Sequence, residues 1–192
     1  MTDIPLFPLS SLVMPEGLLP LRLFERRYLD MVSECFREGT GFGVCLLKSG
    51  HEASGHSEPY SRGTLVSIID FDQGSDGLLH ITGKGETEFN LLQYRQLDDG
   101  LFMGEVSYIE PVAATSMTPE FAALAKKLDV ILSYVEPGIQ YPDKRLDDAD
   151  WVCHRLLELL PLTPPSKMEL LELNSNHKRL EALASMRIEI SA

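Results

Sequence analysis

The residues most suggestive of chemistry are the two histidines and the glutamate of His51-Glu52-Ala53-Ser54-Gly55-His56. Zinc peptidases use such a set, with two histidine ligands four residues apart on one helix and a glutamate as the base. Here the second histidine comes five residues after the first, and Gly55 stands between them in a segment with the composition of a loop. A helix cannot hold this pair on one face, so the stretch does not predict a zinc enzyme.

Three other groups of side chains have simpler explanations than catalysis. Cys153 and His154 are neighbours in a predicted helix, where they point in different directions and cannot act as nucleophile and base. The glycines of residues 39–43 follow a predicted helix and precede a predicted strand, the reverse of a dinucleotide-binding fingerprint. A cation could bind to Asp147, Asp148 and Asp150, but helix capping explains these carboxylates without one. We therefore predict no catalytic residues, no metal and no cofactor.

The composition disfavours two classes of partner. The 192 residues carry 17 basic and 29 acidic side chains, a formal net charge of −12. Binding to a phosphate backbone gains its affinity from clustered Lys and Arg, so this charge disfavours nucleic acid and anionic membranes. Arg22, Arg26 and Arg27 form one local basic cluster, which we predict to be solvated beside acidic neighbours.

The cysteines and the first residues predict a cytoplasmic protein. Cys35, Cys45 and Cys153 are odd in number and far apart, which indicates reduced, buried thiols rather than disulfides or a structural zinc site. The start Met1-Thr2-Asp3 has no basic segment followed by an apolar one, so no secretory signal is expected. Prolines and charges within the apolar residues 6–24 argue against a membrane-spanning helix.

The first thirty residues are mostly apolar and are interrupted by Pro5, Pro8, Pro15 and Pro20. Each proline fixes φ and removes a backbone donor, so no helix can run through this stretch. We predict two short, irregular strands joined by a turn at Glu16-Gly17. Apolar residues at three- and four-residue spacing then predict one helix over residues 25–38, which Gly39 ends.

Residues 42–109 have the pattern of β-structure. A short apolar run predicts a buried strand over residues 42–47, and the composition of residues 49–62 indicates a loop. Two hairpins follow, with strands over residues 63–71, 78–83, 86–92 and 101–109. Together with the amino-terminal strands there are about seven, which fit a compact mixed or antiparallel barrel carrying one helix.

The sequence changes character near residues 111–118, after which it is helical. Thr118-Pro119 starts a helix that Pro137-Gly138 ends, and Asp147 is a candidate N-cap for the next helix. A capping box is indicated by residues 166–169, and a later apolar run suggests a last helix. We predict a β-barrel subdomain over residues 1–112 and a helical subdomain over residues 113–192.

Several short motifs follow one another along the chain: Ile4-Pro5-Leu6-Phe7-Pro8-Leu9, Pro15-Glu16-Gly17, Leu19-Pro20-Leu21, Glu25-Arg26-Arg27-Tyr28, Phe42-Gly43-Val44, Gly63-Thr64, Ile81-Thr82-Gly83-Lys84-Gly85 and Leu170-Leu171-Glu172. In this order they resemble the Lon amino-terminal domain family, the substrate-recognition region that precedes the ATPase in Lon proteases. The resemblance implies an α+β fold in which a PUA-like (pseudouridine-synthase-associated) β-barrel with one helix is followed by a C-terminal helical bundle. The chain has neither a phosphate loop nor a segment for the Lon catalytic Ser and Lys, so protease and ATPase activities are not implied.

The resemblance implies a polypeptide as the partner. Recognition of an extended segment needs exposed apolar surface or an unpaired strand edge, and residues 4–24 can offer both. We predict a peptide-binding groove between the barrel and its helix, and for each candidate residue the alternative is a place in the core. The candidates are Phe7, Leu9, Leu19, Phe24 and Tyr28.

The predicted function is that of a stand-alone, non-enzymatic Lon amino-terminal-like protein, an adaptor or regulator in protein quality control. A PUA-like RNA-binding protein and a small hydrolase are the alternatives. A basic stripe on the folded surface would favour RNA, and a pocket uniting His51, His56 or His80 with a carboxylate and a metal would favour the hydrolase. The oligomeric state is left open.

Overall fold

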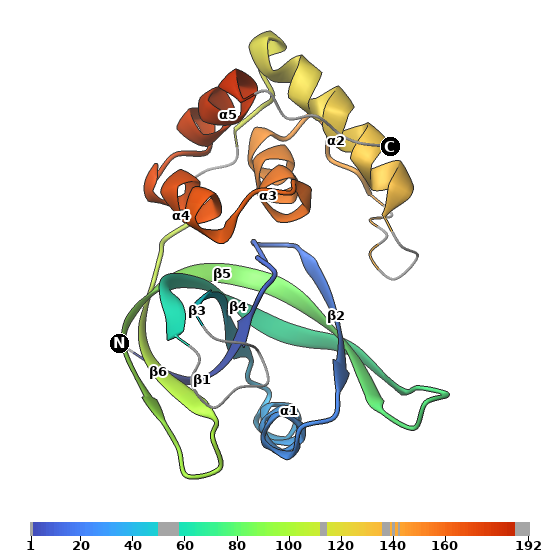
Figure 1. Ribbon diagram of the computed structural model, residues 1–192. Helices are drawn as coiled ribbons and strands as arrows, with labels where there is room; N and C mark the ends of the chain where they lie inside the picture. Colours follow the sequence, from blue (N-terminus) through green and yellow to red (C-terminus); the bar gives the residue numbers. More distant parts are fainter. Residues whose placement is uncertain are drawn as a thin grey trace. The chain divides into compact units, whose positions relative to one another are not determined.

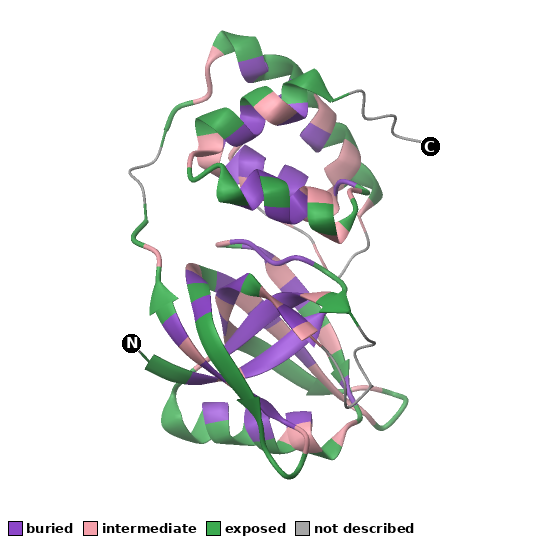
Figure 2. Ribbon diagram, turned by 60° about the vertical axis from the view of Figure 1, so that its left-hand side comes forward, coloured by how far each residue is buried: buried purple, intermediate pink, exposed green. Residues whose placement is uncertain are grey.

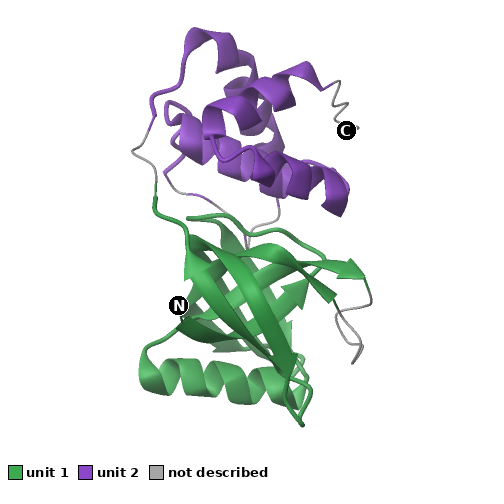
Figure 3. Cartoon of the chain, turned by 90° about the vertical axis from the view of Figure 1, so that its left-hand side faces the viewer, with its two compact units in different colours: residues 1–111 green, residues 112–192 purple. Residues whose placement is uncertain are grey.

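The computed structural model describes residues 2–49, 58–111, 115–135, 139, 141 and 143–186. The chain divides into two compact units, residues 1–111 and 112–192 (Figure 3). Among the described residues, the first unit holds the strands and one helix and the second holds the other helices, which confirms the predicted α+β class. The assignment of residues 1–112 and 113–192 to separate domains stays a prediction.

The described residues of the first unit form six strands and one helix (Figure 1): β1 (Thr2–Leu9), β2 (Leu18–Leu23), α1 (Arg26–Glu38), β3 (Phe42–Ser49), β4 (Glu58–Gln73), β5 (Leu79–Gln96) and β6 (Phe102–Tyr108). The sheet has the order β2-β5-β4-β3-β1-β6, and β6 also pairs with β5. Five strands therefore close into a barrel-like ring, while β2 is attached alongside the first part of β5. β1 and β3 are parallel, and the other pairs between these strands are antiparallel.

One strand is longer than the sequence predicts. Residues 78–83 and 86–92, expected as two strands, belong to the single strand β5, so the described chain has six strands rather than about seven. The pairing of β4 with β5 changes register between Thr64 and Val66. Such irregularities bend a strand without ending it, because the pairing resumes on the other side of the bulge.

Both ends of the predicted loop over residues 49–62 belong to the sheet, since β3 extends to Ser49. β4 begins at Glu58, so residues 58–62 are part of the sheet. The remaining part, with His51 and His56, lies outside the described residues.

The turn between β1 and β2 is held by β5. Glu16 has a left-handed backbone with φ of 64°, and its amide donates to the carbonyl of Gly85 at 2.7 Å. The amide of Gly85 in turn donates to the carbonyl of Gly17 at 2.8 Å. A Cβ atom on Gly85 would collide with the carbonyl oxygen of Met14. Glycine is required here because the turn passes directly over the backbone of β5.

Helix α1 packs its apolar stripe against the strands, where the buried residues gather (Figure 2). The ring of Tyr28 stacks on Phe7 of β1 with 3.8 Å between ring centroids. Met31 and Cys35 are buried in the same cluster. Gly39 ends the helix in the left-handed conformation that such a helix end favours, as predicted.

The second unit is helical, with a short 3-10 turn before its first α-helix. Its elements are η1 (Pro119–Phe121), α2 (Ala122–Tyr134), α3 (Ala149–Leu159), α4 (Pro164–Glu172) and α5 (Asn176–Ser185). The predicted end of the first helix at Pro137-Gly138 lies outside the described residues.

Two helix starts in this unit differ from the prediction. Asp148 rather than Asp147 caps α3, because the Asp148 side chain accepts from two amides of the first turn. Thr163 rather than Ser166 caps α4, and its hydroxyl accepts from the amide of Ser166. The two prolines at residues 164–165 then occupy the first turn of α4, where a missing N–H group leaves no helical hydrogen bond unmade.

Replacing Gly85 with Ala should destabilise the first unit, because the added Cβ atom would push the turn at Met14 away from β5. We expect a loss of about 3 kcal/mol in the free energy of unfolding, measured by urea denaturation followed by circular dichroism. Gly77→Ala is the matched control. Its φ is 79° but nothing lies within 4 Å of the added atom, so only the strained backbone should cost about 1 kcal/mol. Equal losses in the two variants would contradict the role given to the contact with Met14.

Candidate functional site

The five residues predicted to bind peptide do not lie together on the surface. Four of them, Phe7, Leu9, Leu19 and Tyr28, are at most 7 % exposed and belong to one core cluster. Side chains buried to this extent cannot touch a partner while the unit is folded, so a core role describes these four. Phe24 is different, since 66 % of its surface is exposed.

Phe24 lines a hollow of about 510 Å³ at the point where β2 ends and α1 begins. The end of β4, the start of β5 and the turn between them form another wall, and Figure 1 shows this turn reaching outwards past the end of β2. The lining is mainly apolar, with the exposed carboxylate of Asp72 among it. We call this hollow the aromatic cleft; it is lined by Leu23, Phe24, Leu29, Phe71, Asp72, Gln73, Gly77, Leu78 and Leu79.

Two further aromatic residues extend this surface, and neither is among the predicted peptide-binding residues. Phe71 of β4 is 62 % exposed and lines the aromatic cleft together with Phe24. Phe36 of α1 is 42 % exposed, and its ring meets that of Phe71 edge to face with 5.0 Å between centroids. Adjoining exposed aromatic rings of this kind are typical of binding surfaces. The sequence does contain a sign that Phe71 is near the surface, because it stands between Asp70 and Asp72. A strand buried on both faces would not carry two aspartates.

Strand edges lead into the aromatic cleft. Within the described part of the chain, β2 pairs with β5 alone. β4 pairs with β3 only as far as Val66, so residues 67–73 have β5 as their one strand neighbour there. An open edge can accept an extended segment as an added strand. The edge predicted within residues 4–24 is thus present at β2.

The basic cluster next to the aromatic cleft is paired with acidic side chains, as predicted. Arg22 and Arg26 are also solvated, as predicted, but the Arg27 side chain is only 9 % exposed. The closest nitrogen to oxygen distances are 3.7 Å for Arg22 and Asp76, 2.8 Å for Arg26 and Asp30, and 2.7 Å for Arg27 and Glu25. Asp76 also accepts from the amide of Leu78, and this hydrogen bond lowers the pKa of its carboxyl. A phosphate backbone would have to compete with these carboxylates for the three guanidinium groups.

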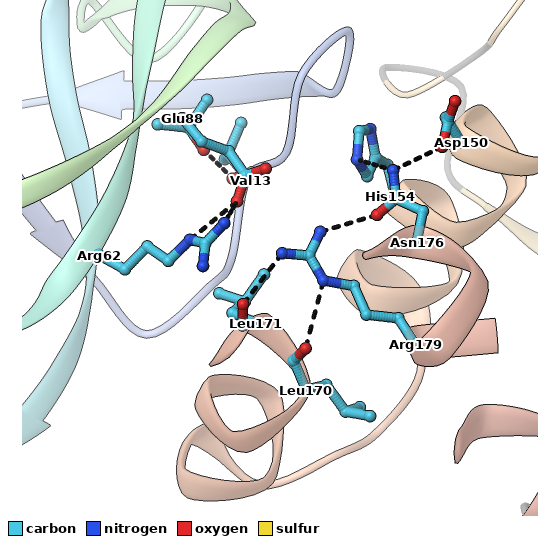
Figure 4. A network of polar contacts seen from close by, with 10 residues as sticks. Val13, Arg62, Glu88, Asp150, His154, Leu170, Leu171, Asn176 and Arg179 are labelled. Carbon is cyan, nitrogen blue, oxygen red and sulfur yellow. Dashed lines mark hydrogen bonds and ion pairs between the residues drawn. The ribbon is translucent and has the colours of Figure 1, made fainter. Parts of the chain in front are cut away.

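In the second unit, the Cys153 thiol is fully buried, as predicted. The neighbouring His154 is only partly exposed, and its Nε2 lies 3.3 Å from Asn176 Nδ2 (Figure 4). The same amide nitrogen donates to Asp150 at 2.7 Å. The imidazole therefore takes part in a polar network between α3 and α5 rather than serving as a base for the thiol.

Arg179 of α5 completes this network (Figure 4). Its guanidinium donates to the carbonyls of Leu170 and Leu171 at 3.2 and 3.0 Å, and to Asn176 Oδ1 at 2.8 Å. The two carbonyls belong to the last turn of α4, where the carbonyl of Leu170 also accepts from the amide of Leu173 at 3.2 Å. The buried Arg179 side chain caps α4 and joins it to α5, which is a structural role.

Metal and thiol chemistry find no support in the part of the chain that the structure describes. It contains no group of three or more His, Cys, Asp or Glu side chains that could hold a metal ion. The cysteines are free and buried, and burial raises the pKa of Cys45 to about 12, which suppresses the reactive thiolate. Of the described helices, none is both long and apolar enough to cross a membrane.

The family of the ATP-dependent protease La (LON) substrate-binding domain matches residues 3–186 of this chain. The chain belongs to the Lon substrate-binding domain family. A Lon N-terminal domain protein from Xanthomonas campestris has a similar crystal structure, with 42 % sequence identity, a TM-score of 0.77, and coverage of 95 % of this chain and 97 % of that one. The N-terminal domain of the Mycobacterium avium complex Lon protease shares the fold, with a TM-score of 0.62 at 16 % identity over 95 % and 96 % of the two chains.

The fold explains two of the motifs that this Lon-family chain carries. Pro15-Glu16-Gly17 and the glycine at the end of residues 81–85 are far apart in sequence, yet they form reciprocal backbone hydrogen bonds. The matching family is a substrate-binding domain, so family membership supports a substrate-binding role for this chain. It gives no reason to expect catalysis.

Leu23 and Phe24 are adjacent apolar residues with opposite environments, 2 % and 66 % exposed. Phe24→Asp should leave the free energy of unfolding within about 0.5 kcal/mol of the unaltered protein, because the new carboxylate stays in water. Leu23→Asp should lose more than about 4 kcal/mol, because it buries an unpaired charge. Thermal unfolding by circular dichroism compares the two, and strong destabilisation by Phe24→Asp would mean that the cleft is closed in solution.

Arg179→Met should destabilise the second unit by about 3 kcal/mol, because it removes three side-chain hydrogen bonds, two of them to buried carbonyls in the last turn of α4. Lys178→Met is the matched control, since Lys178 is the preceding residue and is exposed. Urea unfolding of both variants checks this. A similar, small effect of the two substitutions would contradict the capping role.

Proposed function

We propose that this protein binds extended, unfolded segments of polypeptide in the aromatic cleft and acts as an adaptor or regulator in protein quality control. It holds substrates and does not itself cleave them. We place it in the cytoplasm, where its three free, buried cysteines suit the reducing conditions.

The exposed pair of Phe24 and Phe71 is the observation that carries this proposal. Burying a fully exposed ring in a partner is worth about 1.5–3 kcal/mol. These two rings and the neighbouring Phe36 are partly exposed, so together they can contribute roughly 3–5 of the about 8 kcal/mol of a micromolar affinity. An unfolded chain offers what this surface can bind, namely apolar side chains for the exposed rings and free backbone groups for the open edges of β2 and β4. A folded protein would hide both.

RNA binding is the alternative to polypeptide binding, because the resemblance implies a PUA-like barrel. The net charge of −12 and the pairing of Arg22, Arg26 and Arg27 with carboxylates argue against it. RNA binding would weaken steeply with salt, whereas burial of aromatic rings would not. The salt dependence of binding therefore separates the two functions.

The test is fluorescence anisotropy with a labelled, reduced and carboxymethylated unfolded protein and with a labelled RNA oligonucleotide, each at low and at high salt. We expect saturable, salt-tolerant binding of the unfolded protein only. Phe24→Asp and Phe71→Asp should each weaken it about tenfold or more, because each removes one buried ring.

Tyr134→Asp is the matched control for these variants. Tyr134 is an exposed aromatic residue of the second unit, 75 % exposed, and its replacement should leave the affinity unchanged. Salt-sensitive binding of RNA alone would instead identify a nucleic-acid-binding protein. Equal effects of Phe24→Asp and Tyr134→Asp would place the binding site elsewhere.

A further inference from the structure

A second and larger hollow, of about 720 Å³, lies against another flank of α1. Its helical wall includes Glu34 and Glu38, whereas the aromatic cleft uses Leu29. At 100° per residue, Leu29 is turned by about 140° from Glu34 and about 180° from Glu38, so the two hollows use opposite sides of the helix. Both belong to the first unit.

The shape of this hollow suits an extended chain. The first half of β1, residues 2–5, forms one side of it. β1 pairs with β3 only from Leu6 onwards, so among the described strands residues 2–5 have β6 as their neighbour on one side and face the hollow on the other. A strand half exposed in this way is a template for backbone pairing with a bound segment.

The inner part of the hollow is apolar. Ile4, Met31 and Leu101 line it and are almost fully buried, and Met103 lies beside them. Methionine side chains adapt to differently shaped partners, which suits a site that accepts more than one sequence. A hollow of this size can take up the apolar side chains of a short segment.

The rim is acidic. Three carboxylates line the hollow, from Asp3, Glu34 and Glu38, against one guanidinium, from Arg95. Arg95 is already bound to Asp3 by two hydrogen bonds of 3.1 and 2.5 Å. Glu34 and Glu38 share Arg37 at 3.1 and 3.3 Å, which leaves one negative charge between them uncompensated. This local excess has the same sign as the net charge of the whole chain, −12.

We propose that this hollow, which we call the acidic slot, binds an extended polypeptide segment in which lysine or arginine flanks an apolar residue. The apolar side chain enters among Ile4, Met31 and Leu101, and the cationic side chain meets Glu34 and Glu38 at the rim. The inference rests on the proposed function and makes it more specific, since substrates with basic residues would be preferred over acidic ones of equal hydrophobicity.

The test compares two labelled short peptides by anisotropy at low salt, one of alternating valine and lysine and one of alternating valine and glutamate. The lysine peptide should bind about tenfold more tightly, because several of its charges approach the exposed carboxylates at the rim and low salt screens this attraction little. The double variant Glu34→Gln with Glu38→Gln should reduce this preference to about threefold or less.

Glu169→Gln with Glu172→Gln is the matched control. It changes the net charge by the same amount on exposed positions of α4, in the other unit. The preference for the lysine peptide should survive in this control. If the control loses the preference as fully as the double variant in α1, the attraction comes from the net charge and the acidic slot is rejected.

Other outcomes also decide the matter. Equal affinities for the two peptides would overturn the inference, and displacement of the lysine peptide by an equal concentration of spermidine would identify a site for small cations instead. If the unfolded protein binds and Phe24→Asp weakens it while the peptides are not distinguished, only the acidic slot fails. If neither the unfolded protein nor the peptides bind, the proposed function itself fails.

Discussion

The packing of α1 on the strands is the constraint on which the rest of the first unit depends. The stacked rings of Phe7 and Tyr28 fix the helix against β1, and Arg27 donates to the carbonyl of Gly100 at 2.8 Å, which ties the start of the helix to the turn between β5 and β6. Both hollows use this helix as a wall. Residues that touch no substrate, such as Phe7, therefore decide whether a binding surface exists.

Local patterns predicted the elements well where local chemistry determines them. The spacing of apolar residues and Gly39 gave the limits of α1 within one residue at its start, and the prolines correctly excluded a helix over the first two strands. The glycines of β5 were misleading. The pattern predicts a strand end at Gly83 and places Gly85 between two strands. Both glycines instead lie within β5, where Val66 and Met14 of other segments come close. A glycine needed for such an approach looks, in sequence, like one that ends a strand.

The candidate site was predicted less completely, because exposure depends on tertiary packing. Leu23 and Phe24 are equally apolar, and only the direction in which the chain enters α1 places one inside and the other outside. Phe71 belongs to the site because β4 continues beyond its pairing with β3, which the sequence of β4 alone does not specify. The helix cap at Asp148 is similar, since its backbone forms a bridge with Ser116, distant in sequence.

The thickness of α1 has a consequence for substrate choice when one chain occupies both hollows. The hollows lie on opposite sides of the helix, which is about 11 Å across, so the path around its surface is about 17 Å. An extended chain advances about 3.3 Å per residue, so a segment that joins the two hollows needs roughly five residues or more. Two weak contacts joined in one chain act at a high effective concentration, whereas a fragment too short to join them dissociates from either one alone. The separation of the two hollows would then select substrates by length, so that long unfolded chains are retained and the short fragments that proteolysis leaves behind are released.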